Sequence, residues 1–275
     1  MPELPEVEQV ARNLKNIIQP PAKIVGWVFA RKDLRFPLQQ NELHKLVGLQ
    51  IHKIERRAKY ILLSVGESHI LIFHLGMTGQ WRVASGDQRK HDHVSLKLNV
   101  LGQSIELIYE DPRRFGFIQI ISVAQLGQRF KDLGVEPLDP QTNWDFITAQ
   151  FKKFNSPIKS AIMDQKKIVG VGNIYASEAL FRAGIYPMKS CAKISSKKYA
   201  KLWAEIRNVL SEAIEKGGST ISSFQNSYGE KGNFQNNFFV YDLAGQLCKI
   251  CRKSKIKQTK ILGRSTFWCP TCQKS

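Results

Sequence analysis

Four of the five cysteines lie in the last 28 residues, and their spacing limits what this end of the chain can form. They make two C-x2-C pairs, Cys248 with Cys251 and Cys269 with Cys272, separated by seventeen residues. Two close pairs joined by a hairpin-sized insert can place four thiolates around one tetrahedral zinc ion. Two disulfides are the alternative, but cysteines three residues apart pair poorly, and disulfides are typical of exported proteins. We therefore predict one structural Zn²⁺ bound by these thiolates, and we expect Cys191 to be an ordinary, partly buried thiol.

The same 28 residues carry eight basic side chains and no acidic one. Over the whole chain of 275 residues, 41 Lys and Arg against 23 Asp and Glu leave a net charge of +18. A surface this basic attracts polyanions, so nucleic acid or an acidic membrane is the expected partner class. No apolar run approaches the roughly 20 residues that span a bilayer, and the acidic first ten residues do not resemble a secretion signal. We expect a soluble, cytoplasmic nucleic-acid protein with no membrane contact.

The hydrophobic pattern of the first half predicts a helix followed by a sheet. Apolar residues from Val7 to Ile18 have helical spacing, and Pro20-Pro21 ends the helix. From Ile24 to Ile121 short β-rich runs alternate with polar turns. This pattern is typical of an antiparallel sandwich or barrel.

After Asp132 the pattern becomes helical, and a turn-rich segment there predicts a domain boundary. An apolar stripe over residues 197–216 predicts a long helix closed by Gly217-Gly218. Residues 217–235 are rich in Gly, Ser, Asn and Gln, and they predict a long loop that is either functional or mobile.

The first six residues suggest covalent chemistry at the amino terminus. A proline after the initiator Met permits removal of that Met, which exposes Pro2 as a secondary amine with a pKa of about 8. Such an amine can attack a sugar C1′ and form an iminium ion, which is an electron sink for elimination. Glu3 and Glu6 are candidate proton donors to the leaving group or the opened sugar. The alternative is an ordinary helix start, where Pro5 and the acids are favoured by the helix dipole.

This opening and several later motifs resemble the bacterial formamidopyrimidine-DNA glycosylase family, whose members remove oxidised purines from DNA. The resemblance spans the whole chain and its motifs are, in order, Pro2–Glu8, Arg57–Tyr60, Phe73–Gly79, His91–Val94, Asp111–Gly116, Gly170–Glu178 and Gly263–Thr266. The resemblance implies an α+β fold. Its parts are an N-terminal antiparallel β-sandwich with an N-terminal helix (1–133), a helix-two-turn-helix DNA-binding domain (134–237) and a zinc hairpin (238–275).

The resemblance also implies catalytic roles. Pro2 matches the family's nucleophile, Glu3 its acid and Lys59 its β-elimination lysine, although Lys59 also fits a phosphate-facing strand. Arg264 matches the arginine credited with δ-elimination and with gripping phosphates. Because a guanidinium is a poor proton donor, the phosphate role is favoured.

A glycosylase must extrude its target base and fill the gap that remains. Met77, Arg113 and Phe115 match the family's gap-filling side chains, with ordinary sheet core as the alternative for the two apolar residues. Arg114 is expected on the opposite face of a strand, against a phosphate. His93 matches a DNA-contacting residue, although a histidine there is also consistent with a plain surface group.

Lys159 and Asn173 match the family's phosphate ligands, and glycines just before a helix let backbone N–H groups approach phosphates. Two segments depart from the family pattern. Residues 221–224 lack the polar pair expected in the loop over the lesion, and residues 252–254 replace a glycine-containing turn.

Two other functions compete with this prediction. The related endonuclease VIII branch removes oxidised pyrimidines and usually opens Pro-Glu-Gly-Pro-Glu, whereas Leu4 favours the purine branch. A non-catalytic zinc-dependent DNA-binding protein explains the charge and the cysteines but not Pro2, Glu3 or Lys59. We predict a monomeric, bifunctional glycosylase and abasic-site lyase that acts on damaged double-stranded DNA at the bacterial nucleoid. The predicted reaction is a Schiff base on Pro2 followed by β,δ-elimination.

Overall fold

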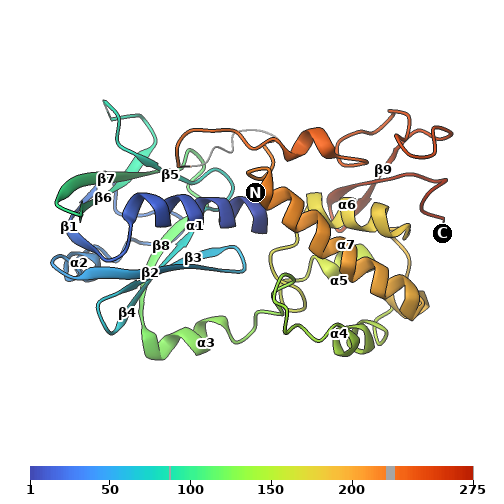
Figure 1. Ribbon diagram of the computed structural model, residues 1–275, viewed down its shortest axis with the longest axis horizontal. Coiled ribbons are helices and arrows are strands. Elements are labelled where there is room, and N and C mark those ends of the chain that lie inside the picture. The colour runs from blue at the N-terminus through green and yellow to red at the C-terminus, as the bar shows by residue number, and fades with distance from the viewer. Residues whose placement is uncertain (87, 221–226, 275) are drawn as a thin grey trace. The chain divides into compact units, whose positions relative to one another are not determined.

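The computed structural model describes residues 1–86, 88–220 and 227–274. The chain divides into two compact units (Figure 1). The sheet unit comprises residues 1–131 and 216–233, and the helical unit comprises residues 132–215 and 234–275. The sheet unit is therefore built from two stretches of chain that are far apart in sequence.

The sheet unit is an antiparallel β-sandwich, as predicted. Its eight strands are hydrogen-bonded in the order β5-β7-β6-β1-β2-β3-β4-β8. Bulges interrupt the register in β1, β2 and β6, and such bulges bend a sheet so that its inner faces share one core. The strands are β1 (Ala22–Phe29), β2 (Gln50–Arg57), β3 (Tyr60–Val65), β4 (His69–His74), β5 (Gln80–Val83), β6 (Asp92–Val100), β7 (Gln103–Glu110) and β8 (Phe117–Ser122).

Helix α1 (Leu4–Ile18) packs against β2 and β3 of this sandwich. Its apolar stripe is buried, as the helical spacing predicts. Glu3 is the N-cap, and the side chain of Glu6 reaches back to the Glu3 N–H in a capping box. Because this cap fixes the first turn, it also fixes the direction of the residues before it.

Three short elements of the sheet unit were not predicted from the sequence. They are α2 (Gln40–His44), α3 (Leu126–Phe130) and the edge strand β5. A strand of four residues is too short to show an alternating pattern. Tertiary packing instead holds β5, whose fully buried Trp81 lies between the rings of Phe73 and Tyr109.

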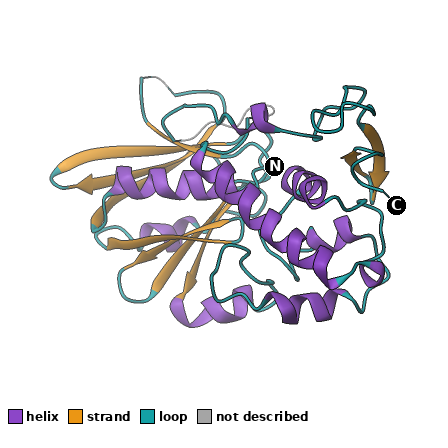
Figure 2. Ribbon diagram, turned by 45° about the vertical axis from the view of Figure 1, so that its right-hand side comes forward, coloured by secondary structure: helices purple, strands orange, loops and turns teal. Residues whose placement is uncertain are grey.

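The helical unit contains four helices and a two-stranded hairpin among its described residues (Figure 2). Helix α6 packs against both α7 and β10. The long α7 begins and ends one residue before the predicted range, and its apolar stripe is buried. The elements are α4 (Trp144–Phe151), α5 (Ile158–Ile162), α6 (Asn173–Ala183), α7 (Ser196–Glu215), β9 (Lys257–Ile261) and β10 (Arg264–Trp268), with short 3-10 helices at Val123–Gln125 in the sheet unit and at Cys191–Lys193 and Phe234–Asn237 here.

A two-residue turn joins β9 to β10. Ile261 pairs with Arg264, and Leu262 and Gly263 between them have φ values of 46° and 75°. Two positive φ values are typical of the tight turns that match the twist of a hairpin. No helix in the described part of the chain is long and apolar enough to cross a membrane.

Candidate active site and metal centre

The amino group of Met1 lies close enough to four charged side chains for their charges to act on it. Burial lowers the pKa of this amino group, the charges of Glu3 and Glu6 raise it, and those of Lys59 and Arg113 lower it. The net result is a pKa below the ordinary 8.0. An amine at this end of the chain is therefore more often neutral, and more nucleophilic, than a fully exposed one.

Glu3 and Glu6 are both buried, at 3% and 2% exposure. One oxygen of Glu6, Oε2, accepts the Glu3 N–H at 2.8 Å. The other, Oε1, accepts the Ser219 N–H at 2.8 Å and the Ser219 hydroxyl at 3.0 Å. A Cβ added to Gly218 would stand 3.0 Å from the same oxygen, and Gly218 has a φ of 81°, so glycine suits this position. The Glu6 carboxylate thus ties the start of α1 to residues 218–219.

Lys59 lies in the tight turn between β2 and β3 and is only 7% exposed. Ala58, the residue before it, has a φ of 54°. Arg56 donates to the Ala58 carbonyl at 3.0 Å and to Glu8 Oε2 on α1 at 2.8 Å. The turn that carries Lys59 is therefore anchored to the helix that carries Glu3.

Met77 and Phe115 are not part of the core, because they are 37% and 44% exposed. The guanidinium of Arg113 lies 4.8 Å from the centre of the Phe115 ring.

Arg114 differs from the prediction, since it lies in a turn with a φ of 56° and not on a strand. His93 is not a surface group either, because it is 6% exposed and its Nε2 lies 2.9 Å from the Asp111 carbonyl oxygen.

His74 is a residue to which the sequence assigned no role. Burial is the main cause that lowers its pKa to about 4, and the charges of Lys59, Arg35 and Arg129 lower it further. Its ring stacks on Phe117, 5.2 Å away, and its Nδ1 accepts a backbone N–H at 3.1 Å. His74 is therefore neutral at pH 7, in a strongly cationic part of the sheet unit. The sequence signal that could have identified His74 is its place at the end of a predicted strand, beside a glycine turn.

In the helical unit, Lys159 and Asn173 meet at the start of β10. The Lys159 ammonium is buried, at 1% exposure, and donates to Asn173 Oδ1 at 2.7 Å and to Thr266 Oγ1 at 2.9 Å. Lys159 and Asn173 also both donate to the Ser265 carbonyl. These bonds tie β10 to α5 and α6. Arg264, at the start of β10, is exposed and lines a cavity of about 220 Å³.

Glu178 is a second residue that the sequence did not single out. It is fully buried on α6 and accepts the backbone N–H groups of Phe239, Val240 and Tyr241 at 2.8–3.0 Å. Burial raises the pKa of this carboxyl, while the three N–H groups oppose that rise. The segment before the cysteine hairpin is therefore fixed to α6. The sequence signal that could have identified Glu178 is a carboxylate on an otherwise apolar helix face.

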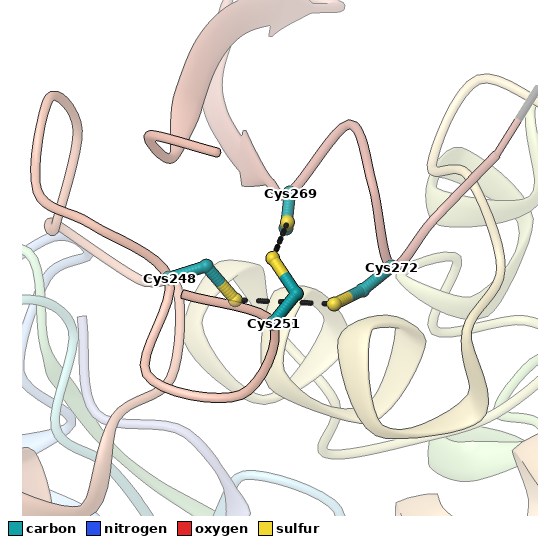
Figure 3. A group of neighbouring side chains, drawn as sticks. All are labelled: Cys248, Cys251, Cys269 and Cys272. Carbon is teal, nitrogen blue, oxygen red and sulfur yellow. Dashed lines mark hydrogen bonds between the residues drawn. The ribbon is translucent and has the colours of Figure 1, made fainter. Parts of the chain in front are cut away.

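Four cysteine sulfurs converge beside the β9-β10 hairpin (Figure 3). All lie within 4.8 Å of one another, with 3.9 Å between Cys248 and Cys272 and 3.6 Å between Cys251 and Cys269. Sulfurs about 2.3 Å from a tetrahedral zinc ion would be about 3.8 Å apart, so the residues fit a metal ion. None of the five cysteines forms a disulfide in this structure, so the geometry favours the metal site over the disulfide alternative.

The turn directly after the first cysteine pair, at residues 252–254, departs from the family pattern, and the structure shows how it is accommodated. Arg252 has a φ of 50°, a conformation usual for glycine. The backbone N–H groups of Lys253 and Ser254 bond to Cys251 and lower the pKa of its thiol to about 6. The other departure, at residues 221–224, lies outside the described residues.

Family models match two parts of the chain. They are described as the formamidopyrimidine-DNA glycosylase N-terminal domain, at residues 1–118, and the H2TH domain of the same enzyme, at residues 133–225. Formamidopyrimidine-DNA glycosylase of Bdellovibrio bacteriovorus is 44% identical over 275 residues and is covered in full, as is this chain.

Solved structures of the Lactococcus lactis enzyme agree with this match. A mutant bound to DNA containing Fapy-dG has a TM-score of 0.91, with 33% identity and full coverage of both chains. A complex with DNA containing an abasic site has a TM-score of 0.90, with 33% identity over 99% of this chain and 100% of the other.

Fold, site and comparisons together define a bifunctional DNA glycosylase of base-excision repair, an enzyme that removes a damaged base and cleaves the abasic strand. The chain belongs to the formamidopyrimidine-DNA glycosylase family and acts on oxidised purines. The endonuclease VIII-like and non-catalytic alternatives are not favoured.

Proposed function

We propose that this enzyme excises formamidopyrimidines and 8-oxoguanine through its own amino terminus. After Met1 is removed, the Pro2 amine attacks C1′ of the damaged nucleoside. The base then leaves with a proton from Glu3, and an iminium ion joins Pro2 to the opened sugar. The observation that carries this proposal is the lowered pKa of an amino terminus set among Glu3, Glu6 and Lys59.

The same iminium ion supports strand cleavage. It stabilises the electron pair left when a proton is removed from C2′, and the 3′ phosphate departs in the β-elimination. A second, δ-elimination releases the 5′ phosphate. We assign Lys59 to the β-elimination. We assign two roles to Arg264, which are the δ-elimination and the holding of phosphates. Glu6, whose carboxylate already holds Ser219, positions this machinery.

We assign contact with duplex DNA to residues of both units. Met77, Arg113 and Phe115 fill the gap left by the extruded base, and their exposure supports this role. The further DNA-binding residues of this proposal are Arg114, His93, Lys159 and Asn173, of which the buried His93 and Lys159 act through the segments that they hold.

For the metal, we propose a single zinc ion. Four thiolates would fill all its coordination positions and leave none for a catalytic water, so its role is structural.

We further propose that the enzyme works as a monomer in the bacterial cytoplasm. Its three proposed domains are residues 1–133, 134–237 and 238–275.

Borohydride trapping on a duplex with one 8-oxoguanine tests the nucleophile. The chain with a verified Pro2 terminus should form a covalent complex, and peptide mass analysis should place the DNA on Pro2. A chain with a tag before Pro2 should bind the duplex but neither excise nor cross-link. The same tag after Ser275 is the matched control. Full trapping by the blocked chain would overturn the proposal.

A further inference from the structure

Asp111 is a fully buried carboxylate directly after β7, and it joins two segments of the sheet unit. Its Oδ1 accepts the Thr78 hydroxyl at 2.5 Å and the Arg113 N–H at 3.3 Å. Its Oδ2 accepts the Gly116 N–H at 2.8 Å. Because Thr78 follows Met77 directly, one carboxylate links the segment of Met77 to the segment of Arg113.

These two segments also touch through their backbones. A Cβ added to Gly76 would lie 2.3 Å from the Gly116 nitrogen. Cβ atoms added to Gly79 and Gly116 would lie 2.1 Å and 1.7 Å from the hydroxyl oxygen of Tyr109. Burial, followed by the charge of Asp111 and a hydrogen bond to it, raises the pKa of Tyr109 well above its ordinary value. The hydroxyl therefore stays protonated, and it donates to the His74 carbonyl oxygen at 3.4 Å.

The backbone of Asp111 is held as well. Its carbonyl oxygen accepts the Arg114 N–H at 3.1 Å and lies 2.9 Å from His93 Nε2, while its own N–H donates to the His91 carbonyl at 3.1 Å. The carboxylate is therefore fixed in position before any ligand binds.

We propose that Asp111 is a positioning residue for base extrusion, which holds Met77, Arg113 and Phe115 as one rigid body that enters the DNA stack together. The inference rests on the proposed gap-filling role of those three side chains. Unstacking a base step costs free energy, and a wedge that is already ordered adds no further ordering cost at that moment. A carboxylate suits the position because the Thr78 hydroxyl and the N–H groups of Arg113 and Gly116, which bond to its oxygens, are all donors. An amide would turn its own N–H groups toward some of these donors.

Asp111→Asn and Thr78→Val test the proposal, and Thr78→Ser is the matched control because it keeps the hydroxyl. Single-turnover excision of 8-oxoguanine is measured beside cleavage of a preformed abasic site, where no base needs extrusion. The fluorescence of 2-aminopurine opposite the lesion reports unstacking. Asp111→Asn should slow excision and the fluorescence change roughly ten- to a hundred-fold. Thr78→Val should slow both less, Thr78→Ser should match the parent, and abasic-site cleavage should change little.

A double-variant cycle separates this inference from the proposed function. If Asp111 acts through Met77, Met77→Ala should cost far less in the Asp111→Asn background than in the parent. Should Met77→Ala alone leave excision unchanged, the gap-filling role itself is wrong. If Met77→Ala slows excision while Asp111→Asn and Thr78→Val extrude at the parent rate, the role of Asp111 is wrong. Equal losses on both substrates, together with a lower melting temperature, would also overturn it and leave a purely structural carboxylate.

Discussion

Glu3 and Glu6 are three residues apart and both are buried, but their surroundings suit them to different tasks. Glu6 receives hydrogen bonds from the backbone of Glu3 and from Ser219, so both its oxygens act as acceptors. Because these contacts engage both oxygens, Glu6 is suited to holding the start of α1 and residues 218–219 in place. Protonation of the leaving base is therefore better assigned to Glu3.

Glu3→Gln and Lys59→Ala should separate the two chemical steps. Glu3→Gln should reduce excision of 8-oxoguanine by roughly 10²–10⁴ while cleavage of a preformed abasic site continues, because that substrate needs no leaving-group proton. Lys59→Ala should instead slow cleavage of the preformed abasic site, because Lys59 is assigned to the β-elimination, and it should still bind DNA. Gel assays on both substrates, with circular dichroism as the folding control, measure this. If both variants lose every activity equally, the assigned roles are wrong.

His74 should make the stability of the sheet unit depend on pH. Its pKa is about 4 in the folded chain and 6.5 ordinarily, so the unfolded chain binds the extra proton first as pH falls. The free energy of unfolding should therefore fall as pH drops from 6.5 toward 4, and stay insensitive to His74 above 6.5. Urea unfolding at several pH values should show a shallower dependence in His74→Asn. An identical pH dependence in both proteins would contradict the lowered pKa.

At the scale of single elements, the cysteine hairpin has a small apolar core of its own beside the four cysteine sulfurs. Its buried cluster includes Phe267, Ile256, Cys248 and Cys269, beside the tight turn at Leu262-Gly263. Lys159 adds a second attachment, because it binds β10 to the helices. Arg264 is therefore presented from a strand held at both ends.

Cys269→Ser should release the metal and weaken DNA binding. The metal should be lost because four thiolates fit a tetrahedral ion and three do not complete its coordination. DNA binding should weaken because this segment carries eight basic residues, whose arrangement the metal would hold. The slope of log K against log salt should become shallower by about 0.9 for each phosphate that the variant no longer neutralises. Zinc analysis and binding isotherms at two or more salt concentrations test this. A zinc-free variant with the parent's affinity and slope would refute the role of the hairpin.

The sequence predicted the elements whose pattern is local. The strands of the sandwich, α1 and α7 each carry a periodic apolar face, and the cysteine pairs carry their own spacing. It did not predict β5, which is held by the rings around Trp81, or the turn that contains Arg114. The partners of Asp111 and Glu6 were also inaccessible, because Thr78 and Ser219 are distant in sequence. Such pairs form only when tertiary packing brings them together.

For the whole molecule, the main fact is that each unit has its own apolar core. Separate cores allow separate unfolding transitions. Leu71 of the sheet unit and Leu202 of the helical unit are both fully buried and offer a matched pair of probes.

Leu71→Ala and Leu202→Ala should each destabilise only their own unit. Truncation of a buried leucine costs about 2–5 kcal/mol, so each variant should lower one calorimetric transition and leave the other in place. Hydrogen exchange followed by mass spectrometry identifies the unit that opens. A single transition that both variants lower by the same amount would show instead that the units unfold together.

The division of the sheet unit into residues 1–131 and 216–233 sets an order of events on the ribosome. Glu6 leaves the ribosome 213 residues ahead of Ser219, its hydrogen-bond partner. At about 5–20 residues per second this interval lasts roughly 10–40 s. Throughout it, the nascent chain cannot close residues 218–219 against α1. The amino terminus is therefore not yet closed in during translation, and the proposed removal of Met1 can take place before the protein is complete.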